Sequence, residues 1–117
     1  MDPKLIKNRI KMIVKEVMKK VHNKDYEGVE GVVDKVEMGI EKFIGTMKCI
    51  EKMMDSEDSI DEVSDDEEIN FLKPVGGVHY RAYHLLKTCG DDLFIAMEFE
   101  FLLTETGIIS ILQAVNA

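Results

Sequence analysis

The spacing of hydrophobic residues changes near residue 70. Before this point apolar residues recur every three or four positions, and after it they alternate with other residues. The alternation is clearest at six consecutive odd positions, all of them apolar: Leu93, Ile95, Met97, Phe99, Phe101 and Leu103. Helical segments followed by consecutive strands predict an α+β domain, in which N-terminal helices pack on one face of an antiparallel β-sheet. The 117 residues suffice for one domain, with a helical part (1–54), an acidic loop (55–68) and a β-meander (69–117).

The first helix has the clearest pattern in the N-terminal part. Asp2 is the expected N-cap, because Pro3 fits the first turn of a helix. The helix should stop at residues 22–24, and lysines occupy the face opposite its apolar stripe. The apolar stripe consists of Ile6, Ile10, Ile13, Val14, Val17, Met18 and Val21.

Residues 25–54 allow two interpretations. Asp25 can cap a second helical segment, and a new helical pattern of apolar residues begins at Gly39. A single helix over 25–54 would contain four interior glycines, each of which costs about 1 kcal/mol relative to alanine. We therefore favour two helices with a break near 34–39, where 35–38 would form a short strand or a turn.

Residues 55–68 form a strongly acidic segment. Nine of these 14 residues are Asp or Glu, and Ile60 and Val63 are the only apolar ones. Such a segment cannot bury enough surface to fold alone, so we predict an exposed, mobile loop. A calcium loop needs a glycine among its ligands, and no glycine lies between Gly45 and Gly76. We therefore expect no metal site.

The C-terminal part reads as strands separated by turns. A short edge strand over 69–73 should end at Pro74, and Gly76 and Gly77 form a bend. Turns are expected at 89–92 and 104–107, and connections this short join antiparallel neighbours. The three strands of this meander are expected at Val78–Thr88, Leu93–Leu103 and Ile108–Val115.

A two- or four-residue loop at 89–92 pairs residues whose numbers sum to 181. Three pairs then lie on the helix-facing side: Tyr80 with Phe101, Ala82 with Phe99, and His84 with Met97. Tyr80 and His84 are the polar-tipped side chains on this side. They could act on or orient a ligand, or they could satisfy their polar atoms inside an apolar core.

The same register places Arg81 opposite Glu100 and Tyr83 opposite Glu98 on the second face of the sheet, where we predict an Arg81–Glu100 ion pair and a polar pair. Apolar residues share that face: Leu85, Phe94, Ala96 and Leu102, joined by Ile108 and Leu112 in a bulged register or by Ile109 and Ile111 in an unbulged one. An apolar patch around charged residues predicts that something packs on it. Either segment 55–73 folds back over it or a second copy covers it, and we favour the second copy. The candidate dimer-face residues are Arg81, Tyr83, Glu98, Glu100 and Leu102.

Charge is distributed unevenly along the chain. The net charge of −8 divides into +6 over 1–24, −12 over 25–68 and −2 over 69–117. Overall acidity argues against nucleic-acid binding, which requires phosphates to be neutralised. We interpret the lysines of the first helix as a solvated face that lies against the acidic segment of the same chain.

Neither the termini nor the cysteines point to export. No apolar run approaches the roughly 18 residues of a membrane span, and the N-terminal segment lacks the apolar core of a signal peptide. Cys49 and Cys89 have no metal-binding or redox spacing. We expect a cytoplasmic protein with reduced thiols, no cofactor and no membrane association.

The order of elements resembles a known superfamily. A long first helix, a short helix opened by Asn-Lys-Asp-Tyr-Glu-Gly-Val (23–29), a helix from Gly39 and a meander containing Gly-Ile-Ile-Ser-Ile (107–111) are similar to nuclear-transport-factor-2-like proteins, which include ketosteroid isomerases and polyketide-cyclase-like proteins. The resemblance implies a curved sheet forming a cone-shaped roll around an apolar pocket, and a homodimer through the outer sheet face. No catalytic residue of the isomerases matches a position in this chain.

Two functional hypotheses follow from these features. In the first, the cone pocket binds a small hydrophobic molecule, with or without a reaction, and its lining includes Tyr80, His84, Met97, Phe99 and Phe101. In the second, the protein is a non-enzymatic, homodimeric interaction module. Glu98 and Glu100 serve better as structural or interface groups than as a catalytic pair, because Arg81 and Tyr83 lie beside them.

Overall fold

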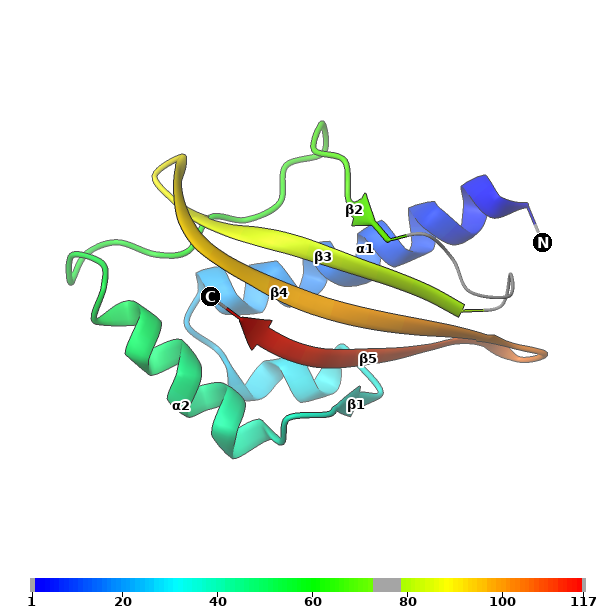
Figure 1. Cartoon of the computed structure of the whole chain (residues 1–117), viewed down its shortest axis with the longest axis horizontal. Coiled ribbons are helices and arrows are strands. Elements are labelled where there is room, and N and C mark those ends of the chain that lie inside the picture. The colour runs from blue at the N-terminus through cyan, green and yellow to red at the C-terminus, as the bar shows by residue number, and fades with distance from the viewer. Residues whose placement is uncertain (1, 73–78, 117) are drawn as a thin grey trace.

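A computed structural model describes residues 2–72 and 79–116 as helices packed on a sheet (Figure 1). The α+β class is confirmed. In chain order the elements are α1 (Pro3–His22), the 3₁₀ helix η1 (Glu27–Gly31), β1 (Lys35–Val36), α2 (Ile40–Glu51), β2 (Asn70–Phe71), β3 (His79–Thr88), β4 (Asp91–Thr104) and β5 (Gly107–Asn116). The expected bend at Gly76 and Gly77, and Val78 at the start of the predicted strand, lie outside the described residues.

The sheet is open and has the strand order β1-β5-β4-β3-β2. The meander β3–β4–β5 is antiparallel, as expected, and β2 adds to its edge as a strand shorter than the predicted 69–73. The difference from a wholly antiparallel sheet is β1, which pairs parallel with β5. The sheet is therefore mixed, because the segment between η1 and α2 runs along the outer edge of β5.

Helix α1 forms as the sequence predicts. The Asp2 side chain accepts a hydrogen bond of 2.9 Å from the backbone N–H of Lys4, and Pro3 occupies the first turn. The helix ends at His22, followed by Asn23 as the C-cap. Its buried stripe is Ile6, Ile10, Val14, Val17, Met18 and Val21.

The region 25–54 contains two separate helices, which confirms the favoured interpretation. Asp25 Oδ1 accepts the backbone N–H of Gly28 at 3.1 Å, and a Cβ on Gly28 would collide with that carboxylate. Gly39 has φ +84° immediately before α2, a conformation that most other residues avoid. These two glycines therefore fix the turn into η1 and the break before α2.

The predicted pairing of β3 with β4 is confirmed over residues 79–85, and the loop has two residues, but it lies one residue earlier than a sum of 181 requires. Thr88 pairs with Asp91, so the turn consists of Cys89 and Gly90 alone, both with positive φ. Between the next two pairs, Leu85–Ala96 and Lys87–Asp92, β4 has two more residues than β3. This irregularity restores the expected sum of 181.

The β4–β5 pairing resolves the two registers left open by the sequence. Ile109 lies opposite Leu102 and Ile111 opposite Glu100, as in the unbulged alternative. A register shift follows at Glu98, where β5 has one extra residue, Gln113.

The core lies between the helices and one face of the sheet. Helix α1 runs behind β3 and β4, and no ribbon crosses the near face of β3, β4 and β5 (Figure 1). Phe99 and Phe101 are buried in this core with their rings stacked 6.0 Å apart. Leu86, Met97 and Leu112 are fully buried from the same sheet face.

The acidic segment is not the wholly exposed loop that its composition predicts. Ile60 and Val63 are buried, with 1% and 5% of their surface exposed. Asp61 accepts backbone N–H groups of Cys89 at 2.9 Å and Gly90 at 2.8 Å. Two apolar side chains and one carboxylate therefore fasten the segment to the core and to the tip of the β3–β4 hairpin, although it has no regular secondary structure.

Basic residues of α1 hold the following part of the segment. Lys15 forms an ion pair with the carboxylate of Asp65, and this pairing lowers the pKa of Asp65. Lys11 Nζ donates to the backbone oxygen of Asp65 at 2.6 Å. The interpretation that the basic helix lies against the acidic segment is confirmed for these residues.

Candidate functional site

Tyr80 and His84 lie where the sequence places them, on the helix-facing side of β3. Each has 7% of its surface exposed. Burial lowers the pKa of His84, with Lys87 acting in the same direction and Glu67 opposing it. Burial therefore favours the neutral form of the His84 imidazole.

The other three pocket candidates belong to the same packed interior. Met97 and Phe101 have no exposed surface and Phe99 has 2%. The ring of Tyr80 packs edge-on against Phe71, with 6.4 Å between the centroids. A ligand between the helices and the sheet would require these side chains to move apart, so the pocket remains a prediction.

The second face of the meander is the alternative site, and we call it the open face. It contains Arg81, Tyr83, Leu85, Ala96, Glu98, Glu100, Leu102, Ile109 and Ile111, which alternate with buried positions along β3, β4 and β5. Leu85 is 36% exposed and Ile109 39%. Phe94, at the irregularity in β4, is 81% exposed and has φ +58°. An aromatic residue rarely adopts this conformation.

The polar groups of the open face differ from the prediction. Arg81 is paired with Glu100 through the backbone, but the predicted ion pair is wrong. Glu100 Oε1 instead lies 2.9 Å from His79 Nε2, and its other oxygen accepts a hydrogen bond from Gln113. The His79 imidazole is poorly aligned for a hydrogen bond to Glu100. The contact becomes an ion pair when the imidazole is protonated. A carboxylate on the central strand β4 can reach side chains of either neighbouring strand, β3 or β5. The register alone therefore does not tell which side chain it contacts.

The two remaining charged residues of the open face, Glu98 and Arg81, differ in whether they have a partner. Glu98 accepts a hydrogen bond from the Asn116 amide rather than from Tyr83. Arg81 is exposed and forms no ion pair with any carboxylate of residues 2–72 and 79–116. The face therefore offers a free guanidinium among half-exposed apolar side chains.

The acidic segment does not cover the open face. Its described hydrogen bonds and ion pairs to other elements are with α1, through Lys11, Lys15 and His22, and with the end of the β3–β4 hairpin, through residues 87–90. The alternative in which 55–73 folds back over this face is therefore not observed for residues 55–72. The face is bare within the part of the chain that the structure describes.

A polar contact that the sequence analysis missed joins β1 to β5. Asp34 Oδ2 accepts the backbone N–H of Ser110 at 2.8 Å and its hydroxyl at 3.2 Å, and Ser110 O accepts the N–H of Asp34 at 2.9 Å. Among residues 2–72 and 79–116, Ser110 and His84 are the two buried polar residues. The only sequence signal was a serine among the apolar residues of the last strand.

Other kinds of site find little support in the described residues. They contain no group of three or more His, Cys, Asp or Glu side chains arranged to hold a metal ion. Cys49 and Cys89 are exposed free thiols. None of the described helices is both long and apolar enough to cross a membrane.

Comparison of the chain with protein-family models, curated proteins and solved structures found no match. The resemblance to the nuclear-transport-factor-2-like superfamily therefore stays a prediction.

Proposed function

We propose that this protein is a non-enzymatic interaction module that works as a homodimer through its open face. The observation that carries the proposal is a sheet face that no described residue covers, on which Leu85, Leu102 and Ile109 are only partly buried. Antiparallel sheets that face water usually alternate apolar with polar residues. An apolar patch of this kind on a small domain is typical of a surface that binds another protein.

The charges of the open face support a second copy as the partner. Arg81 and His79 line β3, while Glu98 and Glu100 line β4. A two-fold contact brings the same surface together with itself, so both signs of charge must be present. The chain as a whole has a net charge of −8, and two copies therefore repel each other over most other surfaces.

The position of Phe94 supports the same proposal. It is held with positive φ, and its backbone N–H donates to Asp92 Oδ1 at 2.6 Å. An exposed aromatic side chain supplies a large contact area when a partner packs on it.

Sedimentation velocity over a range of protein concentrations tests the proposal. The wild-type chain should sediment as a species of twice its 13.3 kDa mass. Leu102→Glu should sediment as a monomer, because it places a charge in the centre of the contact. Met53→Glu is the matched control: Met53 is also an exposed apolar residue, at 64%, but lies after α2, and this variant should remain dimeric. A monomeric wild type at every concentration overturns the proposal.

Binding of a small hydrophobic molecule between the helices and the sheet is the second candidate. It is favoured by one observation, the burial of His84 on the same face of β3 as Tyr80 in an otherwise apolar interior. Such a ligand should perturb the ring resonances of both residues in NMR spectra. A crystal structure with an apolar compound bound elsewhere would contradict it.

A further inference from the structure

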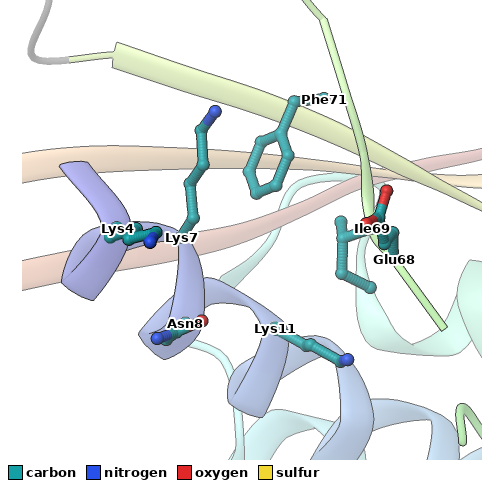
Figure 2. Close-up of a pocket in the computed structure, with 7 residues that line it drawn as sticks. All are labelled: Lys4, Lys7, Asn8, Lys11, Glu68, Ile69 and Phe71. Atoms are coloured by element: carbon teal, nitrogen blue, oxygen red, sulfur yellow. The ribbon is translucent and has the colours of Figure 1, made fainter. Parts of the chain in front are cut away.

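A hollow of about 510 Å³ lies between the first half of α1 and the chain that leads into β2. Figure 2 shows side chains of α1 on one side of it and side chains from the β2 region on the other. The lysines on the α1 side are Lys4, Lys7 and Lys11, and the opposite side is formed by Glu68, Ile69 and Phe71. The hollow shares no residue with the open face.

The three lysines are placed where their charges oppose helix stability. They are three and four residues apart, so they lie on one side of α1. Like charges at these spacings repel one another. They also occupy the half of the helix where the backbone dipole is positive, and the N-cap carboxylate of Asp2 is the acidic group at that end. A bound anion would relieve both effects.

Carboxylates of the described residues compensate these ammonium groups only in part, since Lys11 helps to lower the pKa of Asp65. In residues 2–72 and 79–116, no carboxylate forms an ion pair with Lys4, Lys7 or Lys11. Lys11 Nζ donates to a backbone oxygen, that of Asp65, while the Asp65 carboxylate is engaged by Lys15. The hollow therefore has a net positive lining in a chain whose net charge is −8.

The opposite side of the hollow supplies an apolar surface. Ile69 and Phe71 are partly buried, and the Phe71 ring is fixed against Tyr80 of the core. Lys7 Nζ lies 5.3 Å from the centroid of the Phe71 ring, within the range of a cation–π contact. An ammonium group and an aromatic surface are therefore held side by side.

We propose that this hollow binds a small organic anion with an apolar or aromatic body. Its acidic group would contact Lys4 and Lys7, and its body would lie on Ile69 and Phe71. The volume is within the range of small-molecule sites. Glu68 limits the negative charge that the hollow accepts, because it is the one carboxylate among its lining residues.

Amide chemical shifts followed by NMR, with naphthalene-2-sulfonate as the probe, test this proposal. Shift changes should cluster at residues 4–11 and 68–71 and give a saturable curve. Lys7→Gln should weaken binding about fivefold, and Glu68→Gln should strengthen it about twofold, as expected for single partly exposed charges. Lys48→Gln, which removes an exposed lysine of α2 outside the hollow, should leave the affinity unchanged.

Two further probes separate this site from simpler kinds of binding. Neutral 2-naphthol should bind at least about fivefold more weakly than the sulfonate, since it lacks the charge, and inorganic sulfate should cause no saturable shifts at 68–71. Equal binding of 2-naphthol, equal binding of sulfate, or sulfonate shifts centred on the open face would each overturn the proposal. The Leu102→Glu variant should bind the sulfonate with wild-type affinity, because the site does not depend on dimerisation.

Discussion

The two faces of β3, β4 and β5 are formed by alternate residues of the same strands, yet their surroundings differ completely. On β4, Phe101 is fully buried, while the next residue, Leu102, is only partly covered. The buried face is closed by α1 and the acidic segment, and the open face is bare among the described residues. Folding requires only the first face to be apolar, and the apolar residues of the second are the basis of the proposed dimer contact.

The largest expected effect is the difference in stability between variants of two neighbouring residues, one on each face of the sheet. Phe101→Ala should lower the free energy of unfolding by about 3–5 kcal/mol, as for large buried aromatic residues, and by the same amount at every protein concentration. Leu102→Ala should lower the free energy of unfolding by less, and this loss should grow with protein concentration if the open face is a dimer contact. Urea denaturation at two protein concentrations measures both losses of stability. A concentration-independent cost for Leu102→Ala would remove the distinction between the faces.

The next effect compares polar contacts on the two faces. Asp34→Ala removes the acceptor of the buried Ser110 N–H, and leaving such a group unpaired should cost about 1–3 kcal/mol. Gln113→Ala removes a hydrogen bond to Glu100 on the open face. Water can replace this bond in the monomer, so the loss in the free energy of unfolding should be smaller there. Chemical denaturation of the two variants in the Leu102→Glu background checks this, and equal losses would contradict it.

A third comparison uses the histidines on the two sides of β3. Burial lowers the pKa of His84 below the 6.5 expected in the unfolded chain. As the pH falls below about 6.5, the unfolded state therefore takes up a proton that the folded state does not, and stability decreases. This loss should be reduced in His84→Gln and retained in His79→Gln. Thermal unfolding between neutral pH and pH 5 gives the measurement, and identical profiles for the wild type and His84→Gln would contradict the assignment.

The smallest effect concerns the contact that keeps the acidic segment on the helix side. Lys15→Gln removes the exposed ion pair with Asp65. Exposed pairs contribute little and are screened by salt. We expect a small decrease in Tm at low salt that disappears at high salt. A large, salt-independent decrease would show that the segment depends on this pair rather than on Ile60, Val63 and Asp61.

The sequence was sufficient for the fold class and for the central register, because one-residue slips would bury Glu98 and Glu100. It was not sufficient for the turn. The tight Cys89–Gly90 turn and the two extra residues in β4 shift the pairing in opposite directions, so an incorrect turn gave a correct register. Phe94 with positive φ could not be foreseen, since aromatic residues rarely adopt that conformation.

The candidate sites were predictable to a similar degree. Alternation placed Tyr80, His84 and the open face correctly, but side-chain partners such as His79 with Glu100 depend on rotamers and on the third strand. The burial of Ile60 and Val63 was hidden by the acidic residues around them. The hollow beside Lys7 depends on the position of β2 in space, which no local pattern in α1 specifies.

The most direct test of the central claim is whether a second copy contacts the open face. In an equal mixture of isotope-labelled and unlabelled chains, isotope-filtered NMR detects contacts between copies only. We predict intermolecular contacts from the methyl groups of Leu102, Ile109 and Ile111 to open-face residues of the other copy. Intermolecular contacts confined to α1 or α2, or none at concentrations where the protein is well above its monomer mass, would contradict the account.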